Sequence, residues 1–229
     1  MFLQGYLPSI LEGTMLTLAI SAASLLFSVM FGLTGALFHR ASHRSLVWLA
    51  ALYSNVVRGI PDLVWIFVLF FGGQVAINEL AALFDMEAPQ VNTLVAGIMT
   101  IGFIFGAYMT ETFRGAILAI PRGQTEAGYA YGMNHRQVFL RITLPQMIRF
   151  ALPSLANNWL GLMKTTALVS VIGLPDMMYH ADITKSATHQ PFTVYLVVAG
   201  LYLAITSVSM LLFNLAQKHF TSSLKPTEL

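Results

Sequence analysis

Two long stretches of this chain, residues 15–38 and 192–216, contain no charged side chain. A helix of about 20 apolar residues crosses the roughly 30 Å hydrocarbon core of a bilayer. Helix is required there because every backbone N–H and C=O must be bonded within the protein. Charged residues make up only 10% of the chain and hydrophobic residues 56%, against roughly 25% charged in an ordinary soluble domain. The sequence therefore predicts an all-α membrane protein in contact with a lipid bilayer.

Three more segments meet or approach the same length, which gives five predicted transmembrane helices. Two of them are interrupted by charge, one by Arg58 and Asp62 and the other by Lys164. We predict a single transmembrane domain over residues 1–229, with spans at about 15–38, 46–71, 91–113, 150–174 and 192–216 and a loop at 118–145.

The distribution of lysine and arginine predicts the orientation of these spans, because cytoplasmic loops are enriched in both. Arg40 and Arg44 follow the first span, five arginines lie between residues 114 and 149, and Lys218 and Lys225 follow the last span. The loop at 78–90 has three acids and no base. We therefore expect the amino terminus outside and the carboxyl terminus in the cytoplasm, with Lys185 as an exception on the outer side.

The loop between the third and fourth spans carries local structural signals of its own. Glu126 opens a helix-compatible stretch, where the helix dipole favours an acid, and Gly132 suits a left-handed turn at its end. Asn134 and Gln137 have the spacing of a capping box that begins a second helix, and we expect Pro145 to end that helix. The pattern predicts a rigid pair of short helices shaped to enter a groove in another protein.

This loop resembles the EAA loop of ABC importer permeases. The motif is EAA, three residues, G, nine residues and I-x-L-P, and the matching residues here are Glu126, Ala127, Gly128, Gly132, Ile142, Leu144 and Pro145. Gly128 stands where alanine is more usual. Glycine keeps the surface small but lowers helix propensity by about 1 kcal/mol, which predicts looser docking at that point.

Three further segments, RGIPDLV (58–64) and residues 106–124 and 157–177, resemble the polar amino acid branch of these permeases. They are most similar to the subunits that serve histidine, lysine, arginine, ornithine and opines. The resemblance implies a type I ABC importer permease fold in a bacterial inner membrane. The implied partners are a second permease chain (a heterodimer is favoured over a homodimer), two ABC ATPases and a periplasmic solute-binding protein.

The same resemblance implies that the EAA loop docks in a cleft of the ATPase. No G-x-x-x-x-G-K-[ST] motif occurs in the chain, so we expect ATP and Mg on the partner ATPase and no cofactor on this subunit. The chain has no cysteine, and its six histidines show no ligand spacing, so we expect no metal site. The basic residues fit a topogenic role rather than nucleic acid binding.

Ionisable groups inside a span are costly unless they face a partner or a wet cavity, so each is a candidate for the substrate pathway. Asp62 follows Pro61, where the helix ladder is already broken. Its carboxylate is expected either to receive the cationic side chain of a substrate or to pair with Arg58, four residues earlier. The resemblance implies that an acid here is typical of members that carry basic amino acids.

Two other groups have open interpretations. Glu111 is expected either to pair with Arg114 or hold a helix interface, or to contact the substrate's ammonium group. Lys164 lies in a polar stripe that lines the pathway or joins the second permease; its other members are Asn157, Asn158, Thr165 and Thr166. The predicted pathway residues are Asp62, Glu111, Asn158, Lys164 and Thr165.

The sequence thus predicts a permease without catalytic activity that imports a basic amino acid, with glutamine, glutamate or another polar amino acid as the alternative. Two other classes of protein fit less well. A membrane enzyme using Asp62 and Glu111 as a carboxylate pair would need a motif such as H-E-x-x-H or G-x-S-x-G, and neither occurs. A stand-alone channel or secondary carrier would have no use for an ATPase-docking loop.

Overall fold

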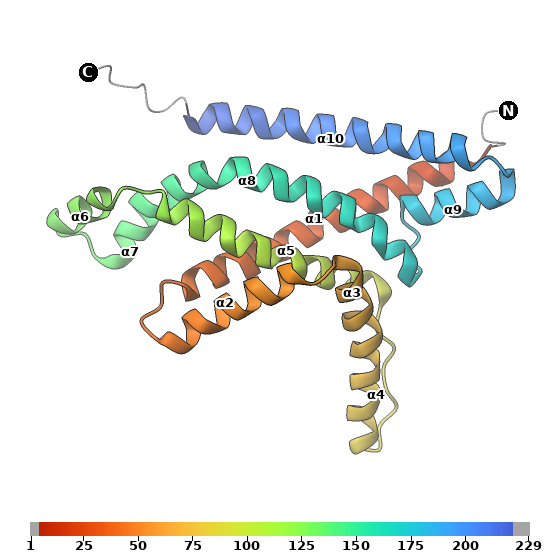
Figure 1. Cartoon of the computed structure of the whole chain (residues 1–229), viewed down its shortest axis with the longest axis horizontal. Coiled ribbons are helices and arrows are strands. Elements are labelled where there is room, and N and C mark those ends of the chain that lie inside the picture. Colours follow the sequence, from red (N-terminus) through yellow and green to blue (C-terminus); the bar gives the residue numbers. More distant parts are fainter. Residues whose placement is uncertain (1–4, 222–229) are drawn as a thin grey trace.

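The computed structural model describes residues 5–221, which contain helices and no strands (Figure 1). The α-helices are α1 (Leu7–Phe38), α2 (Arg44–Gly59), α3 (Asp62–Phe67), α4 (Gly73–Leu83), α5 (Thr93–Leu118), α6 (Arg122–Ala130), α7 (His135–Val138), α8 (Leu144–Thr165), α9 (Met177–Thr188) and α10 (Pro191–Thr221). Two π-helical segments, η2 (Val68–Gly72) and η3 (Phe139–Thr143), and the 3₁₀ segment η4 (Thr166–Ile172) join them. Lys225, used above to predict orientation, lies outside the described residues.

Four continuous helical stretches are long and apolar enough to cross a membrane. They are Leu7–Phe38, Asp62–Leu83, Thr93–Leu118 and Pro191–Phe220. A fifth candidate is bent by 56° and joins His135–Ile172 to Met177–Thr188. In Figure 1, α6 and α7 lie at one end of the molecule and α9 at the other, and α1, α5, α8 and α10 run between these two ends.

The second span is broken at Pro61, as predicted, but it does not end at residue 71: the helical stretch after the break continues to Leu83, into the predicted loop at 78–90. The helix breaks at Ile60 and Pro61, which are both extended, with ψ angles of 136° and 138°. Proline disfavours helix at the residue before it and offers no N–H to the preceding turn. The helical arm that follows, Asp62–Leu83, projects away from the other helices (Figure 1), and only 6% of its most apolar window is buried.

The break leaves carbonyl groups at the end of α2 without helical partners, as at any helix terminus. Trp65 supplies one replacement, since its Nε1–H donates to the carbonyl of Val57 at 3.0 Å. The broken segment is therefore held in place by a side chain from the arm itself.

Small residues bring α1 and α5 into direct contact along the core. The sequence pairs Gly102 with Gly106 at the spacing that permits close helix approach in membranes. A Cβ atom on Gly102 would lie 2.7 Å from the Cβ of Phe27, and one on Gly106 would lie 2.5 Å from the Cβ of Phe31. The predicted close packing is confirmed, and α5 becomes the central helix of the molecule.

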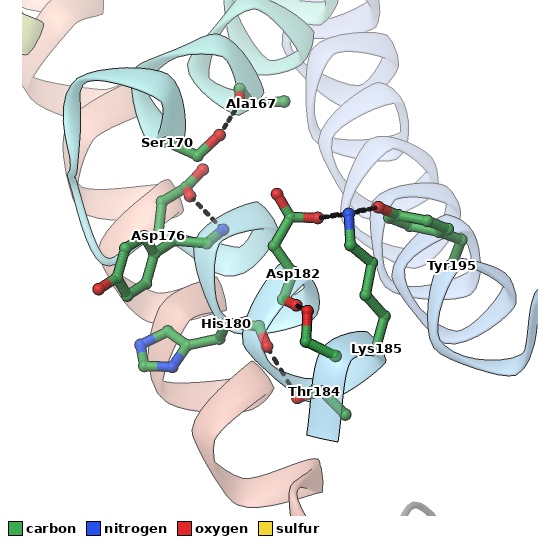
Figure 2. Close-up of polar contacts among 10 residues, drawn as sticks. Ala167, Ser170, Asp176, His180, Asp182, Thr184, Lys185 and Tyr195 are labelled. Atoms are coloured by element: carbon green, nitrogen blue, oxygen red, sulfur yellow. Dashed lines mark hydrogen bonds and ion pairs between the residues drawn. The ribbon is translucent and has the colours of Figure 1, made fainter. Parts of the chain in front are cut away.

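A polar cluster fastens α9 at the end of the molecule opposite α6 (Figure 2). Asp176 begins α9, and its Oδ1 accepts from the backbone N–H of Tyr179 at 2.9 Å. Lys185, the predicted exception to the charge rule, donates to Asp182 at 2.6 Å and to the hydroxyl of Tyr195 at 2.7 Å. The charge of this lysine is therefore balanced locally, and Tyr195 ties α9 to α10.

Candidate coupling segment and transport pathway

The segment that resembles the EAA loop is a helix, a tight turn and a second helix. α6 begins at Arg122, earlier than predicted, and ends at Ala130. Gly132 then has a φ of 77°, as its left-handed prediction requires. Its N–H donates to the carbonyl of Tyr129 at 2.9 Å, and that of Met133 donates to the carbonyl of Gly128 at 3.1 Å. These two bonds form a Schellman motif, which fixes the direction in which the chain leaves α6.

The second helix begins as predicted. The side chain of Asn134 accepts from the N–H of Gln137 at 2.9 Å, and the side chain of Gln137 accepts from the N–H of Asn134 at 2.9 Å. This reciprocal pair is a complete capping box.

The prediction that Pro145 ends this helix is wrong. The chain stays helical from His135 to Ile172, and Pro145 lies in the first turn of α8. Proline normally clashes with the carbonyl four residues before it, here that of Arg141. That residue lies in the π-helical segment η3. The wider turn of a π-helix makes room for the proline ring and does not need the N–H that proline lacks.

Gly128 is buried inside the segment rather than exposed on its surface. A Cβ atom there would lie 2.6 Å from Cδ1 of Ile142 and 3.1 Å from Cγ2 of Val138. The departure from alanine therefore allows α6 to pack closely on α7 and η3. The two helices are also joined by a 2.8 Å hydrogen bond between the hydroxyl of Tyr129 and Nδ1 of His135.

The remaining residues of the EAA-like pattern divide between two environments. Ile142 and Leu144 are half-buried, while Glu126, Ala127, Gly132 and Pro145 are exposed. Tyr131, next to the glycine joint, is 87% exposed. The segment thus presents small side chains and the rings of Tyr129 and Tyr131 on its outer face, while Val138 and Ile142 pack inside it.

Asp62 and Thr165 lie 103 residues apart in sequence and meet in the structure. The hydroxyl of Thr165 donates to Oδ2 of Asp62 at 3.0 Å, and Asp62 lies in the first turn of α3, where the helix dipole stabilises a carboxylate. In the described part of the chain, Asp62 forms no ion pair with Arg58. The guanidinium of Arg58 instead lies 5.5 Å from the ring centre of Tyr108, in a cation–π contact.

Glu111 forms the predicted pair with Arg114. Nη2 of Arg114 lies 2.6 Å from Oε2 of Glu111, and Nε lies 2.9 Å from the same oxygen. The other carboxylate oxygen accepts from Ser54 of α2 at 3.0 Å. Glu111 therefore joins α5 to α2, as the helix-interface interpretation expects.

Asn158 and Lys164 lie in different surroundings on α8. The amide of Asn158 donates to the hydroxyl of Thr112 on α5 at 2.9 Å, whereas the side chain of Lys164 is exposed. Tyr108, Glu111 and Thr112 are half-buried, although most of α5 around them is fully buried. They form an open polar stripe on α5, which runs between α2 and α8 (Figure 1).

The structure thus brings Asp62 together with Thr165. Glu111 belongs to the stripe on α5, and Asn158 of α8 reaches the stripe through its hydrogen bond to Thr112. Sequence reasoning missed Tyr108, Ser54 and Thr112. Helical spacing was available as a signal for two of them, because residues 108, 111 and 112 share one face of a helix. Ser54 had no signal of its own, because a serine in an apolar helix commonly bonds its own backbone.

In residues 5–221 the structure has four or five candidate spans and a capped, exposed pair of short helices, which defines a multi-span helical membrane protein. Comparisons with known proteins agree. The family model described as "Binding-protein-dependent transport system inner membrane component" matches residues 28–224. The chain belongs to this family, the permeases of ABC importers, and is a multi-pass inner membrane protein that associates with an ATPase and with other permease subunits.

Individual relatives cover nearly the whole chain. The histidine/lysine/arginine/ornithine transport system permease protein HisQ of Salmonella typhimurium is 38% identical, over 99% of this chain and 100% of the relative. The octopine transport system permease protein OccQ of Rhizobium radiobacter is 41% identical, over 90% and 88%. A solved structure described as an amino acid ABC transporter with histidines has a TM-score of 0.79 at 30% identity, covering 93% of this chain and 95% of that one. The predicted type I ABC importer permease fold is confirmed.

Proposed function

We propose that this permease imports basic amino acids and that Asp62 receives their cationic side chain. One observation carries the proposal: a half-buried carboxylate at a helix break is hydrogen-bonded to Thr165 and is not paired with Arg58, the nearest cation in sequence. Its charge is therefore left for another cation. Broken helices with freed polar groups are common at transporter substrate sites.

The names of the relatives support the same class of substrate. Both HisQ and OccQ are named for nitrogen-rich or basic substrates, and both align over Asp62. Lys164 is exposed next to Thr165, so the surface there has both signs of charge. We assign Lys164 to the substrate carboxylate or the second permease, and Glu111 and Asn158 to positioning of the helices around the pathway.

Coupling is assigned to the exposed face of the segment from α6 to η3. A short helix with small side chains can enter a groove of a partner, with anchors spaced at helical intervals. The partner there is the ATPase, which binds ATP and Mg, while this chain binds neither. We further propose a heterodimer of permeases, a periplasmic solute-binding protein, an outer amino terminus and a cytoplasmic carboxyl terminus.

The test is the ATPase activity of the complete complex in nanodiscs, with its solute-binding protein present. Arginine, lysine, histidine, ornithine and octopine are compared with glutamine and glutamate. Stimulation by the first set alone is expected, and Asp62→Asn is expected to abolish it. Asp85→Asn, which removes an exposed carboxylate away from the pathway, serves as the matched control and should keep the stimulation.

Stimulation of the wild-type complex by glutamine or glutamate would refute the basic substrate and leave the importer assignment intact. Coupling is tested separately by deleting residues 126–132. Loss of ATPase association and transport is expected, whereas a deletion that leaves transport unchanged would contradict the assigned role.

A further inference from the structure

A cavity of about 300 Å³ lies at the same end of the molecule as the coupling segment, between the end of α1, the end of α5 and the first turn of α6. It is separate from the Asp62 site and has no role in the function proposed above. Its volume is within the range of small-molecule sites, although at the lower end.

Three arginines from three separate segments line this cavity: Arg40 follows α1, Arg114 is on α5, and Arg122 opens α6. Arg114 is already paired with Glu111. Among the described residues, Arg40 and Arg122 are exposed and have neither an ion-pair partner nor a side-chain hydrogen bond. None of the residues between 5 and 221 that line the cavity is a carboxylate. Two guanidinium groups therefore face a space in which the described chain offers them no counter-ion.

Other features of the lining also fit an anion. His39 lines the cavity, and its Nε2 is buried without a hydrogen-bond partner among the described residues, 3.8 Å from Oε1 of Glu111. The first turn of α6 has no side-chain cap in the described chain, so its backbone N–H groups add partial positive charge beside Thr125. This concentration of positive charge would repel the basic amino acids proposed as substrate.

Part of the lining is apolar. It includes Ile117 and Ile120, which are buried, and Leu118, which is 70% exposed. A site lined by both basic and apolar side chains fits an amphiphile whose charged group is an anion. Basic pockets between membrane helices at the cytoplasmic side bind anionic lipid headgroups, and guanidinium groups match the bidentate geometry of phosphate.

We propose that this cavity binds a phosphate group, supplied by the headgroup of an anionic phospholipid or by a free phosphate. Bound there, the phosphate bridges Arg40, which follows α1, and Arg114 on α5 to Arg122 on α6. Because α6 packs mainly on α7 and η3, this bridge gives the coupling segment a second attachment to the spans.

The test uses the complete complex with its partner subunits. Hydrogen exchange of residues 122–130 is measured in phosphatidylcholine nanodiscs, with phosphatidylglycerol added in one arm and inorganic phosphate in the other. Arg40→Gln/Arg122→Gln, the pocket variant, is compared with Arg44→Gln/Lys218→Gln, which removes two exposed cations that lie outside both the cavity and the coupling segment. Protection of α6 by either additive is expected. In the Arg40→Gln/Arg122→Gln variant, the affinity for the additive that protects α6 should fall about 25-fold, since each basic residue near an anionic surface contributes roughly fivefold.

Each outcome decides the proposal. Protection by phosphatidylglycerol that the pocket variant loses and the control keeps identifies a lipid source, and the same result with inorganic phosphate identifies a free one. Equal losses in both variants, or no protection by either additive, overturn the proposal. If the glutamine variant does not assemble, Arg40→Lys/Arg122→Lys retains the charge and removes the bidentate geometry of the guanidinium groups, and it should weaken binding of the phosphate group. Unchanged binding by this lysine variant would overturn the guanidinium assignment.

Discussion

Gly128 gives the sharpest test of how the coupling segment holds its shape. Alanine at this position would raise helix propensity by about 1 kcal/mol. Its Cβ would also lie 2.6 Å from Cδ1 of Ile142, and moving that flexible end off its rotamer costs about 0.5–1.5 kcal/mol. The two effects nearly cancel, so Gly128→Ala is expected to change the affinity for the ATPase by less than about threefold.

Valine at the same position should behave differently. Its two γ-carbons would fill the space beside Val138, whose Cγ2 is only 3.1 Å from the point that a Cβ atom of residue 128 would occupy. Overpacking of this kind costs about 1–3 kcal/mol, which corresponds to a loss of affinity of about 5- to 150-fold if the docked segment must keep this packing. Gly123→Val is the control, because Gly123 lies on the same helix with no atom within 4 Å of its Cβ position.

A double-mutant cycle isolates the contact itself. Ile142→Val removes the Cδ1 atom that an alanine at residue 128 would meet, and an Ile→Val change in a core costs about 0.5–1.5 kcal/mol by itself. The loss of ATPase-binding free energy in Gly128→Ala/Ile142→Val should be smaller than the sum of the two single losses by about 0.5–1 kcal/mol. The measurement is a titration of purified ATPase onto the permease in nanodiscs. Additive effects in the cycle would refute the packing argument.

Three further predictions concern the pathway and the membrane core. Thr165→Val removes a hydrogen bond to the carboxylate of Asp62 that is worth about 1.5–3 kcal/mol. The half-saturating concentration of basic substrates in the ATPase assay should therefore rise tenfold or more. Thr165→Ser keeps the hydroxyl and should keep the wild-type value. Gly106→Val should sharply lower the yield of folded complex on size-exclusion chromatography, because its Cβ would lie 2.5 Å from the Cβ of Phe31. Gly72→Val, with open space around residue 72, should not lower the yield. Equal yields of the two variants would contradict the close packing of α1 on α5. Asp176→Ala should lower the thermal midpoint of unfolding, because it removes a helix cap worth about 1 kcal/mol. Asp176→Asn should preserve the cap. Identical midpoints for the two variants would contradict the capping role of Asp176.

Local signals in the sequence predicted local structure well. The capping box of Asn134 and Gln137 and the left-handed turn at Gly132 are confirmed, because each depends on residues three to five positions apart. The contact of α1 with α5 at Gly102 and Gly106 was also predictable, since close approach of two helices in a membrane needs residues without large side chains.

The errors came from features that local patterns do not carry. The break at Pro61 was predicted from the proline, but the span was expected to end at residue 71, whereas its helix continues to Leu83. Pro145 was expected to stop a helix that continues through a π turn, and nothing in the sequence marks where a turn widens. The contact between Asp62 and Thr165 joins residues 103 positions apart, and single-sequence periodicity says nothing about such pairs.

The contact of α1 with α5 has a mechanical consequence. Each helix places glycines against the first side-chain carbons of the other: Gly102 and Gly106 lie against Phe27 and Phe31, and Gly32 lies against Met109. Packing this close resists sliding of one helix along the other, so we expect the pair to move as one rigid body in any cycle driven by ATP. The displacement has to be absorbed where the chain can pivot, at Ile60 and Pro61 before the projecting arm and at Gly173, whose φ of 86° precedes α9.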